Sequence, residues 1–198
     1  MKIVGISCSP RKGKSTFYAL ETCLQAAKEA VPGIETTLIE LSETKMNGCL
    51  ACGKCVKVLE CSQEDDFPKM IPVLSDQELA GLVVATPVYF GSMTSQCKAF
   101  LDRCVMFRRN GFLLRDKVGG VIAVGGVRNG GQELAIQAVQ AAMLVQDMVV
   151  VSEGRPTSHY GATLWSGHPD GIEKDAFGLE TARNLGKRVA EVAARMHR

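Results

Sequence analysis

Four cysteines crowd into one short stretch of the chain. Cys49, Cys52, Cys55 and Cys61 fall within thirteen consecutive residues, in the pattern C-x2-C-x2-C-x5-C. Because two intervening residues let successive thiolates converge on one centre, this run supplies four soft ligands from a single loop. Such a compact run favours a [4Fe-4S] cluster, whereas structural zinc sites usually join two C-x2-C pairs from separate knuckles. Zinc binding and free redox thiols are the alternatives.

The other four cysteines are scattered, and we interpret them as packing residues. Cys23, Cys97 and Cys104 lie in expected helices, and Cys8 lies in a loop. Free cysteine is among the most buried residue types. The first residues do not form an export signal, so we expect a cytoplasmic protein whose thiols stay reduced.

A second candidate site follows the first expected strand. The loop there leads directly into the start of a helix, where free backbone N–H groups and the helix dipole favour an anion. Its hydroxyl and cationic side chains suit a terminal phosphate monoester. The residues assigned to this site are Ser9, Arg11, Lys12, Ser15 and Thr16.

The same loop partly matches a nucleotide-hydrolase motif. Gly13-Lys14-Ser15-Thr16 fits the second half of the P-loop pattern G-x-x-x-x-G-K-[ST]. The full pattern requires glycine where this chain has Cys8, and neither the third nor the fourth strand ends in an Asp that would hold Mg²⁺. Phosphate binding without hydrolysis is therefore favoured, with a plain strand-to-helix connection as the remaining alternative.

Two further loops have the composition of a pocket for a planar ring. The loop after the third expected strand carries adjacent aromatic residues and a glycine that lets the backbone approach a ring closely. The loop after the fourth is rich in glycine and adds a charge and an amide. Together with the phosphate loop they favour FMN over a dinucleotide, because the G-x-G-x-x-G pattern is absent. The residues assigned to the ring are Pro87, Val88, Tyr89, Phe90, Gly91, Gly126, Arg128 and Asn129.

The elements that position these loops alternate between strand and helix. The expected strands are Lys2–Ile6, Glu35–Leu41, Gly81–Thr86, Val118–Val124 and Met148–Val151. The expected helices are Ser15–Ala30, Asp66–Leu74, Ser95–Met106, Gln132–Val145 and Gly171–Met196. The third and fourth strands lack polar alternation, which is typical of a parallel sheet covered on both faces.

This order predicts an α/β protein with a flavodoxin-like, doubly wound, five-stranded parallel sheet. In such a sheet the ligand lies outside the carboxyl ends of the strands, where the strand order reverses. We expect one domain over residues 1–198, with residues 46–66 as a cysteine-rich, cluster-binding loop inserted after the second strand. The net charge of +2 and the lack of a long apolar run give no reason to expect a nucleic-acid or membrane partner.

The combination of motifs resembles the iron–sulfur flavoprotein family, a branch of the NAD(P)H-dependent FMN reductase and flavodoxin-like group. The motifs are Ser9–Gly13, the four crowded cysteines, Pro87–Gly91 and Gly125–Glu133. The resemblance covers nearly the whole chain. It implies FMN, a [4Fe-4S] cluster on the four cysteines, a homodimer or homotetramer, a ferredoxin-type electron donor and a small-molecule acceptor.

We therefore expect an FMN-dependent oxidoreductase that passes electrons between the cluster and FMN. The cofactors supply the redox chemistry, so no acid–base catalytic residue is assigned. One alternative is an NAD(P)H-dependent FMN or quinone reductase with structural zinc on the four cysteines; another is a redox-sensing binding protein. The basic residues Arg103, Arg108, Arg109 and Arg115 form either a docking surface for an acidic ferredoxin or a solvated helix end.

Overall fold

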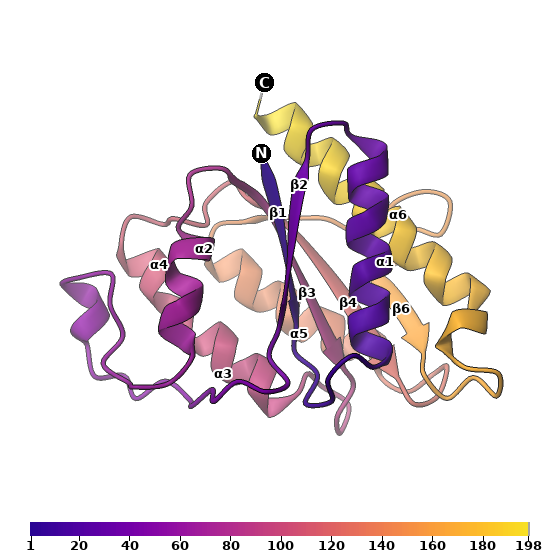
Figure 1. The fold of residues 1–198 in the computed structure, drawn as a ribbon, viewed down its shortest axis with the longest axis horizontal. Helices are drawn as coiled ribbons and strands as arrows, with labels where there is room; N and C mark the ends of the chain where they lie inside the picture. The colour runs from indigo at the N-terminus through magenta and orange to yellow at the C-terminus, as the bar shows by residue number, and fades with distance from the viewer. Residues whose placement is uncertain (198) are drawn as a thin grey trace.

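A parallel β-sheet forms the centre of the computed structural model, which describes residues 1–197 (Figure 1). The strands run in the order β2-β1-β3-β4-β5, with β6 also paired to β4, and every pairing is parallel. Because β3 and β4 are inner strands covered on both faces, they are buried along their whole length. The strands are β1 (Lys2–Ser7), β2 (Glu35–Glu40), β3 (Leu79–Pro87), β4 (Val118–Gly125), β5 (Val149–Val150) and β6 (Ala162–Trp165).

Helices cover both faces of this sheet, so the predicted flavodoxin-like α/β fold is confirmed. One buried cluster joins the sheet to α1 (Ser15–Ala30) and α6 (Ala176–Met196). The cluster on the opposite face joins it to the remaining helices. These are α2 (Ile71–Leu74), α3 (Ser95–Arg103), α4 (Val105–Arg109) and α5 (Gln132–Val145).

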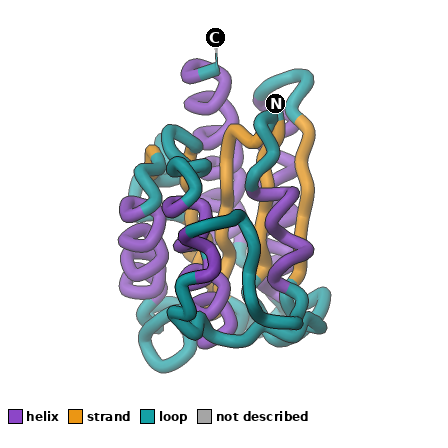
Figure 2. The backbone as a smooth tube through the Cα atoms, turned by 90° about the vertical axis from the view of Figure 1, so that its left-hand side faces the viewer, coloured by secondary structure: helices purple, strands orange, loops and turns teal. Residues whose placement is uncertain are grey.

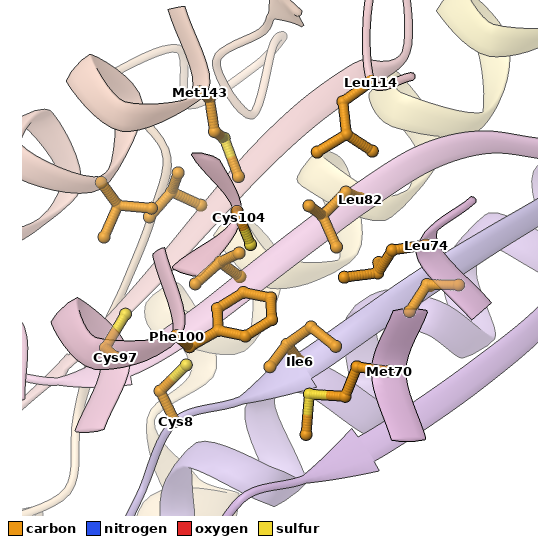
Figure 3. Close-up of a cluster of buried hydrophobic side chains, with 14 of the residues drawn as sticks. Ile6, Cys8, Met70, Leu74, Leu82, Cys97, Phe100, Cys104, Leu114 and Met143 are labelled. Atoms are coloured by element: carbon orange, nitrogen blue, oxygen red, sulfur yellow. The ribbon is translucent and has the colours of Figure 1, made fainter. Parts of the chain in front are cut away.

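The four scattered cysteines are buried, as predicted. Cys23 lies on the buried face of α1, while Cys8, Cys97 and Cys104 belong to the core on the α2–α5 face, around the ring of Phe100 (Figure 3). Burial raises the pKa of the Cys23 thiol to about 12, and it also raises the pKa values of Cys8 and Cys104. These thiols therefore stay protonated and serve as small apolar side chains.

The fifth strand position differs from the prediction, because two short strands share it. The expected strand Met148–Val151 is reduced to β5, which pairs only with the start of β4. The chain then leaves the sheet and returns as β6, which pairs with the end of β4 from Ile122 to Gly125. The sheet thus has six strands instead of five, and the four-residue β6 was missed.

Three predicted helix boundaries also change. The segment predicted as a helix over 66–74 contains Pro68 and Pro72 and forms a 3-10 turn, Phe67–Met70, followed by the single turn of α2. The helix predicted over 95–106 divides at Cys104 into α3 and α4. The last helix begins at Ala176, after a 3-10 turn over Ile172–Lys174, because Asp175 caps it by accepting a hydrogen bond from Gly178 N.

The loops that carry the candidate sites gather at one edge of the molecule. The strand order reverses between β1 and β3, and the loops after β1, β3 and β4 leave the same carboxyl edge (Figure 2). The cysteine-rich segment leaves this edge after β2 and projects beyond α2 and α4, with only the 3-10 turn Lys54–Val56 as regular structure. Within residues 1–197, no helix has the length and apolar character needed to cross a membrane.

Candidate functional site

The β1–α1 loop presents an open helix start at the carboxyl edge. Lys14 occupies the N-cap position of α1 without a side-chain cap, and the first turn carries no acidic residue. Its backbone donors and dipole therefore favour an anion. The Ser9 hydroxyl accepts a hydrogen bond from Arg11 N at 3.1 Å, which fixes the turn that precedes the helix.

Two carboxylates already contact the cationic loop. Glu40, at the end of β2, accepts a hydrogen bond from Gly13 N at 2.8 Å. Lys12 pairs with Glu43 at 2.6 Å, and both of these side chains are exposed. Of the predicted phosphate-binding side chains, Arg11 is exposed and Thr16 is buried at the helix start. The loop thus places an anion-binding backbone next to a carboxylate from the neighbouring strand.

The β3–α3 loop forms a tight turn that exposes an aromatic ring to solvent. Tyr89 and Ser92 exchange backbone hydrogen bonds at 2.9 and 3.1 Å across the turn. Phe90 and Gly91 have φ values of +50° and +75°, the signature of a type I′ turn. The Phe90 side chain is fully exposed at the tip, and Tyr89 is about half exposed. Both aromatics are therefore available to a planar ligand.

Thr94 joins this loop to the phosphate loop. Its hydroxyl donates to Cys8 O at 2.8 Å and accepts from Cys97 N at 3.1 Å, so it caps α3 while holding the end of β1. Thr94 is buried, and sequence reasoning missed it. Because one hydroxyl fixes both loops, their relative position is set without a ligand.

The β4–α5 loop is shaped by buried side chains beneath it. Gln132 accepts from Gly130 N at 2.8 Å and donates to Val127 O at 2.7 Å, so one buried amide holds both ends of the turn. Asn129 and Gly126 are exposed, as expected for ligand contacts. Their binding roles stay predictions, as do those of the residues in the other two loops.

Arg128 makes different contacts from those expected of a ring-binding residue. It forms an ion pair with the buried Asp175 and lies over the Trp165 ring, 5.6 Å from its centroid. Asp175 also accepts from Trp165 N at 2.7 Å, and the indole N–H donates to Gly126 O at 3.0 Å. Arg128 therefore ties the loop after β4 to the end of β6 and the start of α6.

The four crowded cysteines line one pocket beside α3 and α4. This pocket includes Cys49, Cys52, Cys55 and Cys61 together with Arg103 and Arg109. Cys49 and Cys52 are exposed, whereas Cys55 and Cys61 are partly buried and pack against the core on the α2–α5 face. The loop thus brings all four predicted ligands to one place.

Hydrogen-bond donors surround the sulfurs of this pocket. Arg103 donates to Cys61 Sγ at 3.0 Å, and Arg109 donates to Cys55 Sγ at 3.4 Å. The Ser62 hydroxyl lies 3.0 Å from Cys52 Sγ and, with the backbone N–H of Lys54, lowers the pKa of the Cys52 thiol. The lowered pKa favours the thiolate form of Cys52, which is the form that binds metals. Sequence reasoning counted both arginines as surface charges, but Arg103 is buried and cannot contribute to a docking surface.

This donor set fits an iron–sulfur cluster. All four cysteines line one pocket together with Arg103 and Arg109, and buried Arg103 Nε has no hydrogen-bond partner among the described residues. Across residues 1–197, no three Cys, His, Asp or Glu side chains are grouped to hold a metal ion. Four cysteine thiolates are a ligand set for either an iron–sulfur cluster or a zinc ion.

The chain matches a family model described as NADPH-dependent FMN reductase over residues 1–163. It is 42% identical over 192 residues to an iron-sulfur flavoprotein of Methanocaldococcus jannaschii, covering 97% of each chain. It is 38% identical to the iron-sulfur flavoprotein of Methanosarcina thermophila, covering 97% of this chain and 95% of that one. The matches to these two relatives extend over nearly the whole chain.

Solved structures share the fold at lower sequence identity. A WrbA-like flavodoxin protein from Agrobacterium tumefaciens superposes with a TM-score of 0.64 at 20% identity, covering 98% of both chains. An NADH:FMN oxidoreductase in its apo form gives a TM-score of 0.63 at 21% identity, covering 94% of this chain and 88% of that one. The fold, the family model and the full-length relatives agree: the chain belongs to the iron–sulfur flavoprotein family within the FMN reductase group and is an FMN-dependent oxidoreductase.

Proposed function

We propose that this protein transfers electrons between a [4Fe-4S] cluster held by Cys49, Cys52, Cys55 and Cys61 and an FMN bound at the carboxyl edge of the sheet. The observation that carries the proposal is that all four sulfurs line one pocket, with two arginines donating to them. When bound, the cluster exchanges single electrons and FMN exchanges one or two, so the pair links one-electron donors to two-electron acceptors.

Helix α3 connects the two proposed sites. Its first turn is fixed by Thr94 to the phosphate loop, and its last residue is Arg103 at the cysteine pocket. Nine helical residues span about 13 Å, since each adds 1.5 Å. The helix therefore holds the cysteine pocket at a set distance from the loops assigned to FMN.

The chain's own residues bind FMN through its phosphate and its ring. The open start of α1 and the side chains of Ser9, Arg11 and Ser15 receive the phosphate, since no acidic residue opposes it in the first turn. Tyr89 and Phe90 cover the ring from the turn after β3. Arg11→Ala should therefore weaken FMN binding more than it changes iron content, and unchanged FMN affinity would contradict this assignment.

The cluster assignment is tested by composition. Anaerobic purification should yield about four irons and four acid-labile sulfides per chain, together with FMN. Cys52→Ala should abolish iron and sulfide while FMN remains. Cys23→Ala, which alters a buried cysteine outside the pocket, is the matched control and should keep the iron. Stoichiometric zinc without sulfide would refute the cluster and support a zinc-containing reductase.

The name of the matching family model favours a second candidate, an NADPH-dependent FMN or quinone reductase. This alternative predicts rapid oxidation of NADPH by the purified protein. The favoured function instead predicts faster flavin reduction by a reduced ferredoxin-type protein. Arg109 lines the cysteine pocket, its neighbour Arg108 is also exposed on α4, and the two charges suit an acidic donor. The rate with that donor should consequently fall as salt is added.

We further infer that the protein forms a homodimer or homotetramer through the outer face of α5. Leu134, Leu144 and Val145 are each more than half exposed on this helix or at its end. Exposed apolar side chains gathered on one helix are typical of a protein–protein contact. Sedimentation of the native protein tests this directly, and a purely monomeric species would refute it.

A further inference from the structure

One arginine of the cysteine pocket is buried and makes contacts that surface arginines do not. Arg103 is only 2% exposed, and its guanidinium lies 4.4 Å from the centroid of the Phe67 ring. Its Nη1 donates to the fully buried carboxylate of Asp65 and to Asn47 O at 3.3 Å. Its Nη2 donates to Cys61 Sγ at 3.0 Å. The guanidinium therefore bridges the loop base and a proposed ligand.

Asp65 closes the base of the cysteine loop from the other side. Its carboxylate accepts from Asn47 N at 3.0 Å and from Phe67 N at 3.2 Å, so it joins the start of the loop to its end. The neighbouring Asp66 exchanges hydrogen bonds with the Lys45 backbone at 2.7 and 3.0 Å. None of these contacts involves a cysteine. The loop base is thus closed by the protein alone.

The buried guanidinium has more donors than the chain satisfies. Asp65 supplies its single anionic partner, and Nε has no partner within the described residues. A buried cation is stabilised by every negative group placed against it. An anionic sulfur at Cys61 is such a group, because a charge-assisted hydrogen bond is stronger than one to a neutral thiol.

We propose that Arg103 is a positioning residue for the cysteine loop, with two effects. Together with Asp65 it holds the loop closed before any metal binds. Through its bond to Cys61 Sγ it also raises the reduction potential of the cluster, because reduction adds negative charge that the guanidinium stabilises. The second effect rests on the proposed function, whereas the first does not.

Arg109 provides the matched comparison. It also donates to a ligand sulfur, Cys55 Sγ, but at 3.4 Å and from an exposed position on α4. Water replaces such a contact at little cost, and solvent screens its charge. The same substitution at Arg103 and Arg109 therefore separates a buried bridge from a surface contact.

The test compares Arg103→Lys with Arg109→Lys. Lysine keeps the charge opposite Asp65 but loses the planar fork that reaches Asn47 and Cys61. In the metal-free full-length chain, we expect trypsin to cut at Lys54 and Lys57 faster in R103K than in R109K or the native protein. In the anaerobically loaded protein, we expect R103K to release iron to a chelator about 10-fold faster and to have a more negative midpoint potential.

The outcomes distinguish the two proposals. A native protein without iron and sulfide refutes the proposed function, and the trypsin comparison then still decides the loop-closing effect. A loaded native protein with R103K indistinguishable in iron release, potential and proteolysis refutes the role of Arg103. FMN content reports whether each variant is folded. If R103K loses FMN, Asp65→Asn takes its place, and an unchanged cleavage rate in that variant overturns the loop-closing effect.

Discussion

Glu40 should weaken FMN binding by placing a carboxylate at the phosphate loop. Its Oε1 accepts a hydrogen bond from Gly13 N at 2.8 Å, immediately before the open start of α1. A phosphate bound at this helix start would carry a charge of about −1.5 to −2. Glu40→Gln keeps an oxygen that accepts the Gly13 hydrogen bond while removing the negative charge. The substitution should therefore tighten FMN binding.

The size of this effect follows from Coulomb's law. At about 6 Å separation and an effective dielectric constant of roughly 40–80 for a partly exposed pair, the repulsion amounts to about 1–3 kcal/mol. Screening at physiological ionic strength, with a Debye length of about 8 Å, roughly halves this to about 0.5–1.4 kcal/mol. That free energy corresponds to a roughly 2- to 10-fold lower Kd for FMN in the variant.

The assay is quenching of flavin fluorescence on titration into the flavin-free protein. Riboflavin, which has the same ring but no phosphate, is the control ligand, and its affinity should not change. Glu21→Gln, which removes a charge from the exposed face of α1, is the control variant and should leave FMN affinity nearly unaltered. The Glu40→Gln effect should shrink in high salt. Equal gains for riboflavin and FMN, or no gain at all, would refute the reasoning.

Other substitutions test the fold and the assembly. Gly186→Ala should destabilise the protein by about 1–3 kcal/mol in urea unfolding, because the added Cβ would lie 1.9 Å from Cys23 O where α6 meets α1. Burial opposes ionisation of Asp65, but its hydrogen bonds from Arg103 and the backbone outweigh burial and lower its pKa. The native protein should therefore lose stability as pH falls below about 4, and a metal-free Asp65→Asn variant should lose less over the same range by circular dichroism. Leu144→Arg should shift the sedimenting species toward monomer.

The fold was predictable because burial of the central strands is visible in their composition. Leu79–Pro87 and Val118–Gly125 are apolar on both faces, which only a covered parallel sheet accommodates. Strand β6 was missed because Ala162–Trp165 is only four residues long and follows a segment without regular structure. Its position depends on pairing with the end of β4, a contact distant in sequence that local patterns do not encode.

The sequence identified the loop that carries the cysteine pocket, but not the residues that contact its sulfurs. The cysteine spacing named four residues that the structure brings to one pocket, since ligands on one short segment need little tertiary information. The side chains that donate hydrogen bonds to these cysteines could be identified only from the folded structure. Arg103 stands three residues after Phe100, which is buried on α3, so an inward position was available from helical spacing. Because Arg103 lies close in sequence to Arg108 and Arg109, it was instead interpreted as part of a basic surface.

The contacts of Arg128 within the chain could not be predicted from the sequence, and its role toward FMN stays a prediction. Its place in a glycine-rich loop predicts a ligand contact, but Asp175 lies 47 residues away in sequence and binds it through an ion pair. Asp175 was not predicted as a partner of Arg128. Its carboxylate caps α6 and also accepts a hydrogen bond from Trp165 N, and local sequence does not show the second of these contacts. A charge satisfied by a distant buried partner cannot be recognised from local composition.

The cysteine loop is better described as a docked part of the domain than as an appendage. Cys55, Leu59 and Cys61 pack against the same buried cluster that holds α2 to α5 on the sheet, and Phe67 at the end of the loop is fully buried. The ion pair between Asp65 and Arg103 lies at this junction. Because these contacts need no metal, loss of a cluster should leave the sheet and its FMN edge intact while loosening only the exposed segment around Cys49 and Cys52.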